Sequence, residues 1–477
     1  MRKKITIITF LSLFSLALFG CGKKSKTTTQ KKTTTNVVTT EHVHEFGEWQ
    51  ETVKATCSEE GFKKRKCSCG LTEFEIIPKL PHNYVNDKCS VCGHEKLTEG
   101  FHIYYSEEDS LYHIDDYTGT ETTVRIPRYY DDGENGEHNI YFDLISVNET
   151  YESKLKDCNI KKIIIGDGFQ TIDDYMFVGL SNLEELVIES SVKKIGDNTF
   201  YNCSKLSTVT FNEDLEQIGF YAFGSCDIKE IRLPYDLKVL GVGAFANNTN
   251  LTSVSMYNNI IEINNNAFNE TALTSIKIPY SVNYFGPQAH LPNLTTFNID
   301  ARNTIYTFED GCLINQNSKT LIKAIGEVII PSDIVYIDSF AFAYLDYSEI
   351  DFVIPNSVKK LGFSSFYESK LKSLTLSNSL LEIGENAFTN LEFEDNENLV
   401  IELPSTLTTI SYHAFQSFVC KKLVIPSSVT KLDYSAFEDC LIEEIEVYQS
   451  TLNSPDCNRY WNYGIDTDYT TITIIED

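Results

Sequence analysis

The chain of 477 residues is longer than one domain usually is, and its 42% of hydrophobic residues suffices for a large core. Its formal net charge of -28, from 40 basic and 68 acidic residues, argues against nucleic acid as a partner, because phosphate binding needs a basic face. Acidity favours solubility and by itself indicates no catalytic class.

Residues 1–20 have the pattern of a signal peptide. Arg2-Lys3-Lys4 precedes an apolar run from Ile5 to Phe19, which is short for a bilayer span but typical of a signal-peptide core. The run ends in Leu18-Phe19-Gly20-Cys21, which looks like a bacterial lipobox. This resemblance implies cleavage after Gly20, a lipid on Cys21, and anchoring at the extracellular face of a bacterial cell membrane. The alternative is an ordinary signal peptide that contains a cysteine.

Residues 21–41 are rich in threonine and lysine and almost without apolar side chains. Such a segment cannot bury a core, so it is predicted to be a disordered tether. Its lysines would add attraction to anionic headgroups, which gives anchoring a second signal besides the lipid. These lysines are Lys23, Lys24, Lys26, Lys31 and Lys32.

Residues 42–97 concentrate cysteine and histidine, the ligands that tetrahedral zinc prefers. Two knuckles end in glycine, Cys67 to Gly70 and Cys89 to Gly93, and the second has full C-x-x-C spacing. The segment resembles small cysteine- and histidine-containing modules of bacterial surface proteins. It shares with them His44-Glu45-Phe46, Ala55-Thr56-Cys57 and His82-Asn83-Tyr84. We therefore expect a small all-β, zinc-ribbon-like module with a structural zinc ion.

The order of its strands indicates which ligands meet. Segments 46–53, 61–66 and 71–77 alternate like strands of a meander, which brings Cys57, His82, Cys89 and Cys92 to one end. Cys67 and Cys69 fall at the opposite end, near His44. The competing ligand set is Cys67, Cys69, Cys89 and Cys92, and disulfides are the alternative to metal because the chain is secreted. Either way the role is structural, since the core of so small a module is insufficient.

Residues 98–159 are predicted to form an N-terminal cap and a first irregular coil, with 124–127 as its strand. A repeat follows from Phe169 onward, reading apolar-x-x-apolar-Gly-x-x-Ala-Phe. Its anchors are Phe177, Phe200, Phe223, Phe245, Phe268, His290, Phe342, Phe366, Phe388, Phe415 and Phe437. Apart from one wider gap, consecutive anchors are about 22–27 residues apart, a period typical of leucine-rich repeats.

A strand signal follows each anchor, as in Leu206, Val209 and Phe211, and a proline often ends it. One repeat cannot bury both its strand face and its phenylalanine, whereas stacked neighbours can. Residues 160–450 are therefore predicted to form a solenoid of eleven or twelve coils. It would carry a parallel sheet and short irregular or helical convex segments. Residues 451–477 form the C-terminal cap, with a last strand at 470–475 and aromatic residues 460–463 closing the core.

The repeat resembles the BspA-type leucine-rich repeats of bacterial surface proteins. Residues 354–366 follow that pattern closely, and 310–322 look like the variant coil which the family inserts between regular repeats. The resemblance implies a non-enzymatic surface protein whose solenoid binds an extracellular protein or glycan, in adhesion to a host or to other cells. The alternative is an envelope scaffold with no external ligand. A remote one is an enzyme.

Few residues of the repeats indicate chemistry. Cys203, Cys226 and Cys440 share the third position after the anchor with Asn248, which predicts a buried structural slot, and adjacent Cys203 and Cys226 are candidates for a disulfide. His290 is expected in a core slot and His413 on a coil surface. The sequence contains no nucleophile elbow, phosphate loop or metalloprotease helix. The exposed sheet positions are polar, without an aromatic stripe, so the ligand-binding residues stay unidentified.

Overall fold

The computed structural model describes residues 44–476 except 86–87, 132–136, 148–149, 167, 190–191 and 397. The predicted signal peptide, the tether and Cys21 lie outside the described residues. The chain forms two compact units, of which the first joins Phe62–Ile76 to the chain up to Val53. The second joins Lys54–Gly61 to Ile77–Asp477. Among the described residues, no helix has the length and apolar character needed to cross a membrane.

The first unit is built around a three-stranded sheet in the order β1-β2-β3, formed by Gln50–Val53, Gly61–Lys66 and Thr72–Ile77. β1 pairs with β2 in antiparallel register, so the predicted meander is confirmed. Much of the sheet is exposed to solvent, including the large apolar side chains of Val53, Phe62 and Phe74. This small sheet therefore has almost no hydrophobic core of its own.

The second unit begins with a two-stranded hairpin and a cap. The hairpin is β4 (Tyr84–Val85) with β5 (Lys88–Cys89). The cap holds β6 (Phe101–Ser106), β7 (Leu111–Tyr117), β9 (Tyr129–Asp131), β10 (Glu137–Phe142), β11 (Leu144–Val147) and β12 (Thr150–Ser153). In the chain between β7 and β9, β8 (Thr123–Ile126) pairs in parallel with β13 (Lys162–Ile165) of the solenoid. The strand predicted at 124–127 is therefore the strand of the first coil.

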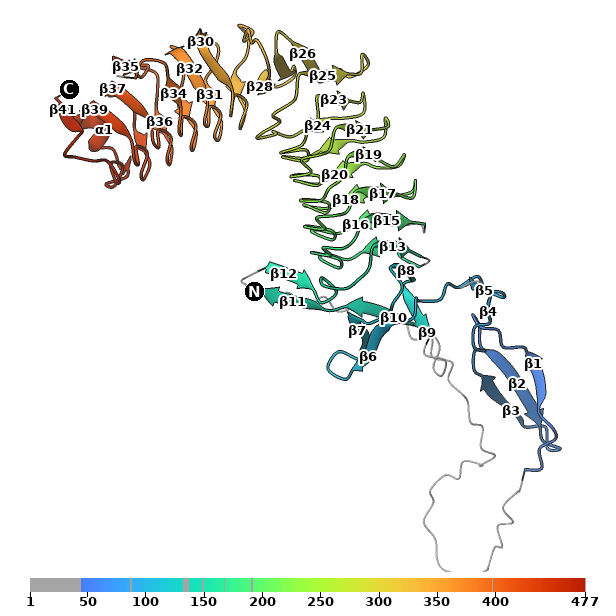
Figure 1. Cartoon of the computed structure of the whole chain (residues 1–477). Helices are drawn as coiled ribbons and strands as arrows, with labels where there is room; N and C mark the ends of the chain where they lie inside the picture. Colours follow the sequence, from blue (N-terminus) through green and yellow to red (C-terminus); the bar gives the residue numbers. More distant parts are fainter. Residues whose placement is uncertain are drawn as a thin grey trace, which may run out of the picture. The chain divides into compact units, whose positions relative to one another are not determined.

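The solenoid makes about thirteen turns and stacks one strand from each coil on the next in parallel (Figure 1). Apolar residues of the repeat lie opposite one another, as Ile163, Leu186 and Val209 do in β13, β15 and β17. In the N-terminal half these strands are β15 (Glu185–Ile188), β17 (Thr208–Thr210), β19 (Glu230–Arg232), β21 (Ser253–Ser255), β23 (Ser275–Ile278) and β25 (Thr296–Ile299). In the C-terminal half they are β30 (Asp346–Val353), β32 (Lys370–Thr375), β34 (Glu392–Phe393), β35 (Val400–Glu402), β37 (Val419–Ile425) and β39 (Leu441–Tyr448).

Each coil also contributes a two-residue strand to a second parallel ladder, which sequence reasoning did not predict. These strands come from the apolar-x-x-apolar segment that precedes the anchor, such as Lys194–Ile195. The first series is β14 (Thr171–Ile172), β16 (Lys194–Ile195), β18 (Gln217–Ile218), β20 (Val239–Leu240), β22 (Glu262–Ile263) and β24 (Tyr284–Phe285). The second is β29 (Tyr336–Ile337), β31 (Lys360–Leu361), β33 (Glu382–Ile383), β36 (Thr409–Ile410), β38 (Lys431–Leu432) and β40 (Asp456–Cys457).

The anchor phenylalanines form two stacks inside the solenoid, one from Phe177 to Phe268 and one from Phe342 to Phe437. The rings of Phe200 and Phe223 are 5.3 Å apart with an interplanar angle of 7°, and those of Phe223 and Phe245 are 5.5 Å apart at 8°. All three side chains are fully buried. The glycine of the repeat lets backbones approach, since a Cβ on Gly219 would lie 2.6 Å from the carbonyl oxygen of Gly196.

The predicted variant coil is an antiparallel meander of β26 (Tyr306–Glu309), β27 (Cys312–Asn315) and β28 (Thr320–Ala324). Gly311 at its first turn has φ +75° and faces the carbonyl oxygen of Glu327. The buried residues of the solenoid form two clusters that meet here: Leu313 and Ile322 belong to the first, Cys312 and Leu321 to the second. Side chains that alternate along the meander therefore pack into the two core clusters on either side of it.

The C-terminal cap agrees with the sequence prediction. β41 (Thr471–Ile475) pairs in parallel with β39, and Trp461 packs edge-on against the last anchor, Phe437, at 5.8 Å. The single turn α1 (Gln449–Leu452) is the one α-helix of the described residues. The convex segments of the described repeats are therefore turns. The sequence predicts either irregular or helical segments there, and the irregular ones are found.

Candidate functional site

Cys57, His82, Cys89 and Cys92 come together in the second unit, with their ligand atoms all within 4.8 Å of one another. We call this group the four-ligand cluster. Thr56 shapes the Cys57 turn by accepting the backbone N–H of Glu59, and its carbonyl oxygen accepts the N–H of Leu80, just before His82. The knuckle closes where Gly93, at φ +81°, donates its N–H to the carbonyl oxygen of Cys89.

The spacing of the four-ligand cluster suits a tetrahedral metal. The sulfur atoms of Cys57 and Cys89 are 3.7 Å apart, and Sγ of Cys92 is 3.2 Å from Nδ1 of His82. Two sulfurs bound to zinc at about 2.3 Å lie about 3.8 Å apart at a tetrahedral angle, whereas a disulfide needs about 2.05 Å. Three thiols and one imidazole therefore fit a structural zinc ion in both chemistry and distance.

The protein environment shifts the pKa values of two thiols of this cluster in opposite directions. Burial raises the pKa of Cys57 to about 12. Burial also opposes ionisation of Cys89, but the N–H groups of Cys92 and Val91 and the side chain of His82 lower the pKa of that thiol to about 5. The lowered pKa favours the thiolate form of Cys89, which is the form that binds metal.

An ion-pair network joins the four-ligand cluster to the solenoid. Glu95 is buried, and its carboxylate accepts hydrogen bonds from Lys88 at 2.8 Å and from Arg125 of β8 at 2.9 Å. Burial alone would raise the pKa of Glu95, but Lys88 and Arg125 together hold it below its ordinary value. Arg125 also contacts Glu189 after β15 at 2.7 Å, so the network fixes the cluster to the first coils.

His44, Cys67 and Cys69 form a separate group in the first unit, again within 4.8 Å of one another. The structure thus gives each knuckle its own partners: Cys67 and Cys69 lie with His44, and Cys89 and Cys92 with Cys57 and His82. The competing prediction, in which the two knuckles share one metal, does not correspond to either group. The ligand set preferred from the strand order, Cys57, His82, Cys89 and Cys92, corresponds to one of the two groups.

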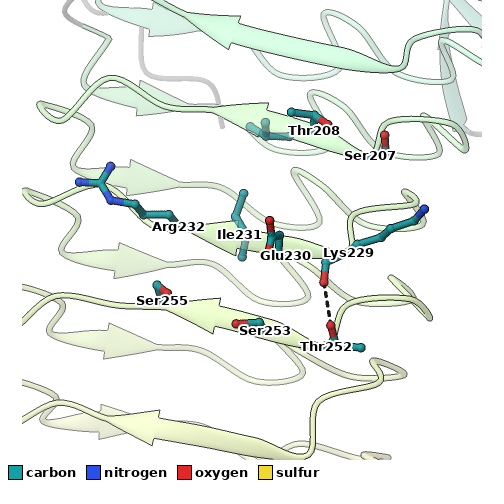
Figure 2. A pocket seen from close by; sticks show the side chains of 10 residues that line it. Ser207, Thr208, Lys229, Glu230, Ile231, Arg232, Thr252, Ser253 and Ser255 are labelled. Carbon is teal, nitrogen blue, oxygen red and sulfur yellow. Dashed lines mark hydrogen bonds between the residues drawn. The ribbon is translucent and has the colours of Figure 1, made fainter.

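A groove of about 720 Å³ lies on the exposed face of β17, β19 and β21, and we call it the sheet groove. Figure 2 shows Lys229, Glu230 and Arg232 of the central coil between short hydroxyl side chains of its neighbours. These are Ser207 and Thr208 on one side and Thr252, Ser253 and Ser255 on the other. Within the part of the chain that the structure describes, Lys229 and Glu230 have no ion-pair partner.

The turn lengths of the repeat account for the position of the sheet groove. Ile228 follows its anchor Phe223 by five positions, whereas Leu206 and Leu251 follow theirs by six. The hydrogen-bonded sheet that contains β17 ends there, and β19 and β21 form the next one. Long charged side chains on the middle coil and short ones on both sides then leave space above the sheet.

Arg232 is held in place at the edge of the sheet groove. Its guanidinium donates to Glu213 at 2.6 Å and to the hydroxyl of Tyr257 at 2.6 Å, and it lies 5.2 Å from the centre of the Tyr257 ring. Glu213 is itself fixed, because it accepts the backbone N–H of Tyr235 at 2.8 Å. A charged group oriented in this way loses little conformational entropy when it binds a ligand.

Tyrosines lie near the sheet groove without lining it: Tyr257 contacts Arg232 at its edge and Tyr235 packs on Tyr257, and sequence reasoning missed them. Tyr235 and Tyr257 touch edge to face at 5.4 Å, and on the next coil Tyr280 carries Arg302 at 4.2 Å over its ring. They lie just beyond the strand ends, so the strand pattern does not include them. The signal was present, since Tyr235 and Tyr280 each follow the proline that ends a strand. Tyrosine and arginine are the residue types enriched where binding energy concentrates.

The shared slot after the anchor is structural, as predicted. Cys203, Cys226 and Asn248 are buried, and each donates to the anchor carbonyl of the preceding coil: to Phe177 at 3.2 Å, Phe200 at 3.3 Å and Phe223 at 2.7 Å. Cys203 and Cys226 are free thiols, and burial raises the pKa of Cys203 to about 12. The fourth member, Cys440, is buried as well.

The core position predicted for His290 is wrong. Its side chain is about one third exposed, forms an ion pair with Glu270 at 2.9 Å and packs on Tyr344 at 4.4 Å. An imidazole in an apolar stack would lack polar partners, and here it has a carboxylate instead. His413 was expected on a coil surface, but its side chain is only 14% exposed, stacks on Tyr412 and pairs with Glu438.

The family model of the BspA type leucine rich repeat region matches this chain with six copies. The matched ranges are residues 138–226, 170–296, 216–325, 313–443 and 390–457. A leucine-rich cell surface protein from Faecalibacterium prausnitzii A2-165 is similar in structure, with a TM-score of 0.56 and 24% identity. The match covers 75% of this chain and 96% of that one. The pneumococcal vaccine antigen PcpA matches at a TM-score of 0.44 and 19% identity, covering 80% of this chain and 100% of its own.

No curated protein matches the sequence significantly. The repeat model spans well over half of the chain, and the stacked coils carry its anchors, its parallel ladders and its variant coil. The protein therefore belongs to the BspA-type leucine-rich-repeat family.

Proposed function

We propose that the protein is a non-enzymatic cell-surface lipoprotein, and that its solenoid binds an extracellular protein or glycan, in adhesion to a host or a neighbouring cell. The sheet groove is the observation that carries the proposal. It combines a fixed arginine with two charged side chains that have no ion-pair partners among the described residues, and the tyrosine pair Tyr235 and Tyr257 lies beside that arginine. Family membership and a neighbour described as a cell surface protein agree with a surface location.

The chemistry of the sheet groove defines the kind of ligand. Serine and threonine hydroxyls donate and accept hydrogen bonds, which suits sugar hydroxyls and peptide groups alike. Tyrosine rings add flat apolar area at low entropic cost. The charges of Lys229 and Glu230 balance, as do those of Arg232 and Glu213, so the ligand should be polar without a large net charge.

The remaining sequence features support a location of this surface outside the cell. A lipid on Cys21 would anchor the chain, and residues 22–41 would hold the folded part away from the membrane. The four-ligand cluster is proposed to bind a structural zinc ion that rigidifies the module between tether and solenoid. Its support is the donor set of three thiols and one imidazole and their spacing.

Binding of the purified chain to immobilised matrix proteins and polysaccharides tests the proposal. We expect saturable binding to at least one surface, reduced at least tenfold in affinity by Arg232→Ala combined with Tyr235→Ala. The matched control is Lys421→Ala, an exposed lysine at the position in β37 that corresponds to Lys229 just before β19. Equal binding by both variants would exclude the sheet groove as the site. Cross-linking to envelope partners alone would favour a scaffold.

Anchoring has its own test. Cys21→Ser should release the protein from the membrane fraction of the cells that produce it, because the thiol that would carry the lipid is gone. A Cys158→Ser variant, which leaves the predicted lipobox intact, should stay with the membranes. Retention of the Cys21→Ser variant in the membrane fraction would contradict the lipid anchor without affecting the sheet groove.

A further inference from the structure

The group of His44, Cys67 and Cys69 has the geometry of metal ligands in its own right. Nδ1 of His44 is 3.2 Å from Sγ of Cys69 and 3.6 Å from Sγ of Cys67. A sulfur and a nitrogen bound to one tetrahedral zinc ion, at about 2.3 and 2.05 Å, lie about 3.5 Å apart. Both thiols therefore converge on one imidazole nitrogen at ligand spacing.

The backbone prearranges this group. Phe46 and Cys67 form an antiparallel bridge, and Ser68 donates its N–H to the carbonyl oxygen of Glu45, which brings His44 beside the turn between β2 and β3. The turn is closed by hydrogen bonds from Gly70 to Cys67 and from Cys67 to Leu71, with Gly70 at φ +96°. Four main-chain hydrogen bonds, counting the one from Gly47 to Lys66, thus hold the ligands near one point.

The donor set selects the metal. Two thiols and an imidazole suit zinc, whereas calcium and magnesium require oxygen ligands, which this group lacks. The described residues provide three ligands here and four in the other cluster. Cys67 is buried, but His44 and Cys69 are exposed, so among the residues that the structure describes, from 44 onward, the side of the site without a ligand faces solvent.

We propose that His44, Cys67 and Cys69 form a second zinc site, separate from the four-ligand cluster, whose fourth coordination position is open and takes water or an external ligand. Zinc sites with four protein ligands are closed and structural, while sites with three can exchange the fourth ligand. The module therefore carries one closed and one open site. This inference does not depend on ligand binding at the sheet groove.

Zinc stoichiometry of the full chain tests the number of sites. The purified chain is reduced, loaded with zinc sulfate, desalted and measured by elemental mass spectrometry. We expect two zinc ions per chain, one for His44→Ala combined with Cys69→Ser, and one for Cys89→Ser combined with Cys92→Ser. The control pair His102→Ala with Cys158→Ser, outside both groups, should retain two. One ion in the wild type, or two in the His44/Cys69 variant, would overturn the proposal.

Cobalt spectroscopy tests whether the second site is open. Cobalt(II) replaces zinc, and its visible absorption bands respond to a change of ligand. Added imidazole should shift these bands in the wild type and in the Cys89/Cys92 variant, but not in the His44/Cys69 variant. Bands that ignore imidazole in every form would contradict the open position. Mass spectrometry that finds Cys67 disulfide-bonded to Cys69, with no second zinc ion after reduction, would show a disulfide turn instead.

Discussion

The solenoid and the cysteine–histidine module are stabilised in different ways. Within each of the two ring stacks, a coil buries its phenylalanine between the rings of its neighbours, so these repeats depend on one another for their core. The strands of the module instead leave Val53, Phe62 and Phe74 exposed, and its buried side chains include Cys57, Cys67 and Cys89. The solenoid is therefore held by packing between neighbouring repeats, and we expect the module to depend on its ligand groups for its fold.

The largest expected effect is on the module. Cys89→Ser should abolish zinc binding at the four-ligand cluster and unfold the segment around it, because apparent binding free energies of structural zinc are roughly 10 kcal/mol or more. Limited proteolysis should then cut between residues 54 and 97 while the solenoid stays intact. Cys158→Ser serves as the control, since that cysteine lies outside both clusters. An uncut module in the Cys89→Ser variant would show that metal does not stabilise it.

The next largest effect is on the ring stack. Phe223→Ala should cost about 3–5 kcal/mol, because it removes a fully buried ring from between two others and leaves a cavity. The urea midpoint of the solenoid transition measures it. Phe220→Ala, which removes a ring that is 45% exposed, should cost less than about 1 kcal/mol. Equal midpoints for the two variants would mean that the stack does not carry the stability of the coils.

Lys323 of β28 makes the junction of the two core halves sensitive to pH. Its ammonium group is buried and donates to the carbonyl oxygens of Ala289 at 3.0 Å and Phe340 at 2.8 Å. Burial lowers the pKa of Lys323 from 10.5 to about 7. Between these values the unfolded chain holds a proton that the folded chain has lost, so stability rises with pH across this window.

Lys323→Met isolates this contribution. The wild type should gain stability, on the order of a few kcal/mol, from pH 7 to pH 10 relative to the variant, because one pKa unit corresponds to about 1.4 kcal/mol. Below pH 7 both states are protonated, and the cost of the buried charge is fully present. Urea midpoints at both pH values measure the difference. The same pH dependence in both proteins would show that Lys323 is solvated or paired in solution.

The smallest expected effect concerns the slot after the anchor. Asn248→Ala should cost about 1–3 kcal/mol, since the carbonyl oxygen of Phe223 and the N–H of Ile228 lose a buried partner. Asn248→Cys should recover part of this loss, because cysteine fills the same slot in two neighbouring coils and bonds to the same kind of carbonyl. Thermal unfolding of the three proteins would rank them. If alanine and cysteine gave the same temperature, the hydrogen bond would be irrelevant.

The sequence predicts most of the solenoid because each coil repeats the same pattern of buried residues, strand and turn. An anchor every 22–27 residues apart from one wider gap, a strand after it and often a proline at the strand end are visible along the chain, and so is the variant coil. The four-ligand cluster was predictable for a related reason, since strand order decides which loops meet. His290 was misplaced because the repeat pattern alone does not show that Glu270 on the preceding coil draws the imidazole out of the core.

The sheet groove could not be read from the repeat, because it arises where the repeat changes. One residue fewer between Phe223 and Ile228 interrupts the ladder, and the adjacent coils differ in side-chain length rather than in pattern. Tyr235 and Tyr257 lie beyond the strands, and only the three-dimensional stack shows that they contact each other and, through Tyr257, Arg232. Turn length and the residue after the strand-ending proline are therefore the signals to examine in such repeats.

Hydrogen exchange of the full chain, with and without a zinc chelator, tests most directly that different forces hold the two regions. After chelation we expect amides of residues 44–97 to exchange at least a hundredfold faster. Amides of the strands from β13 to β39 should be unchanged. Unchanged protection in the module would show that it folds without metal, and a loss of protection spreading through the solenoid would contradict the independence of the phenylalanine stack.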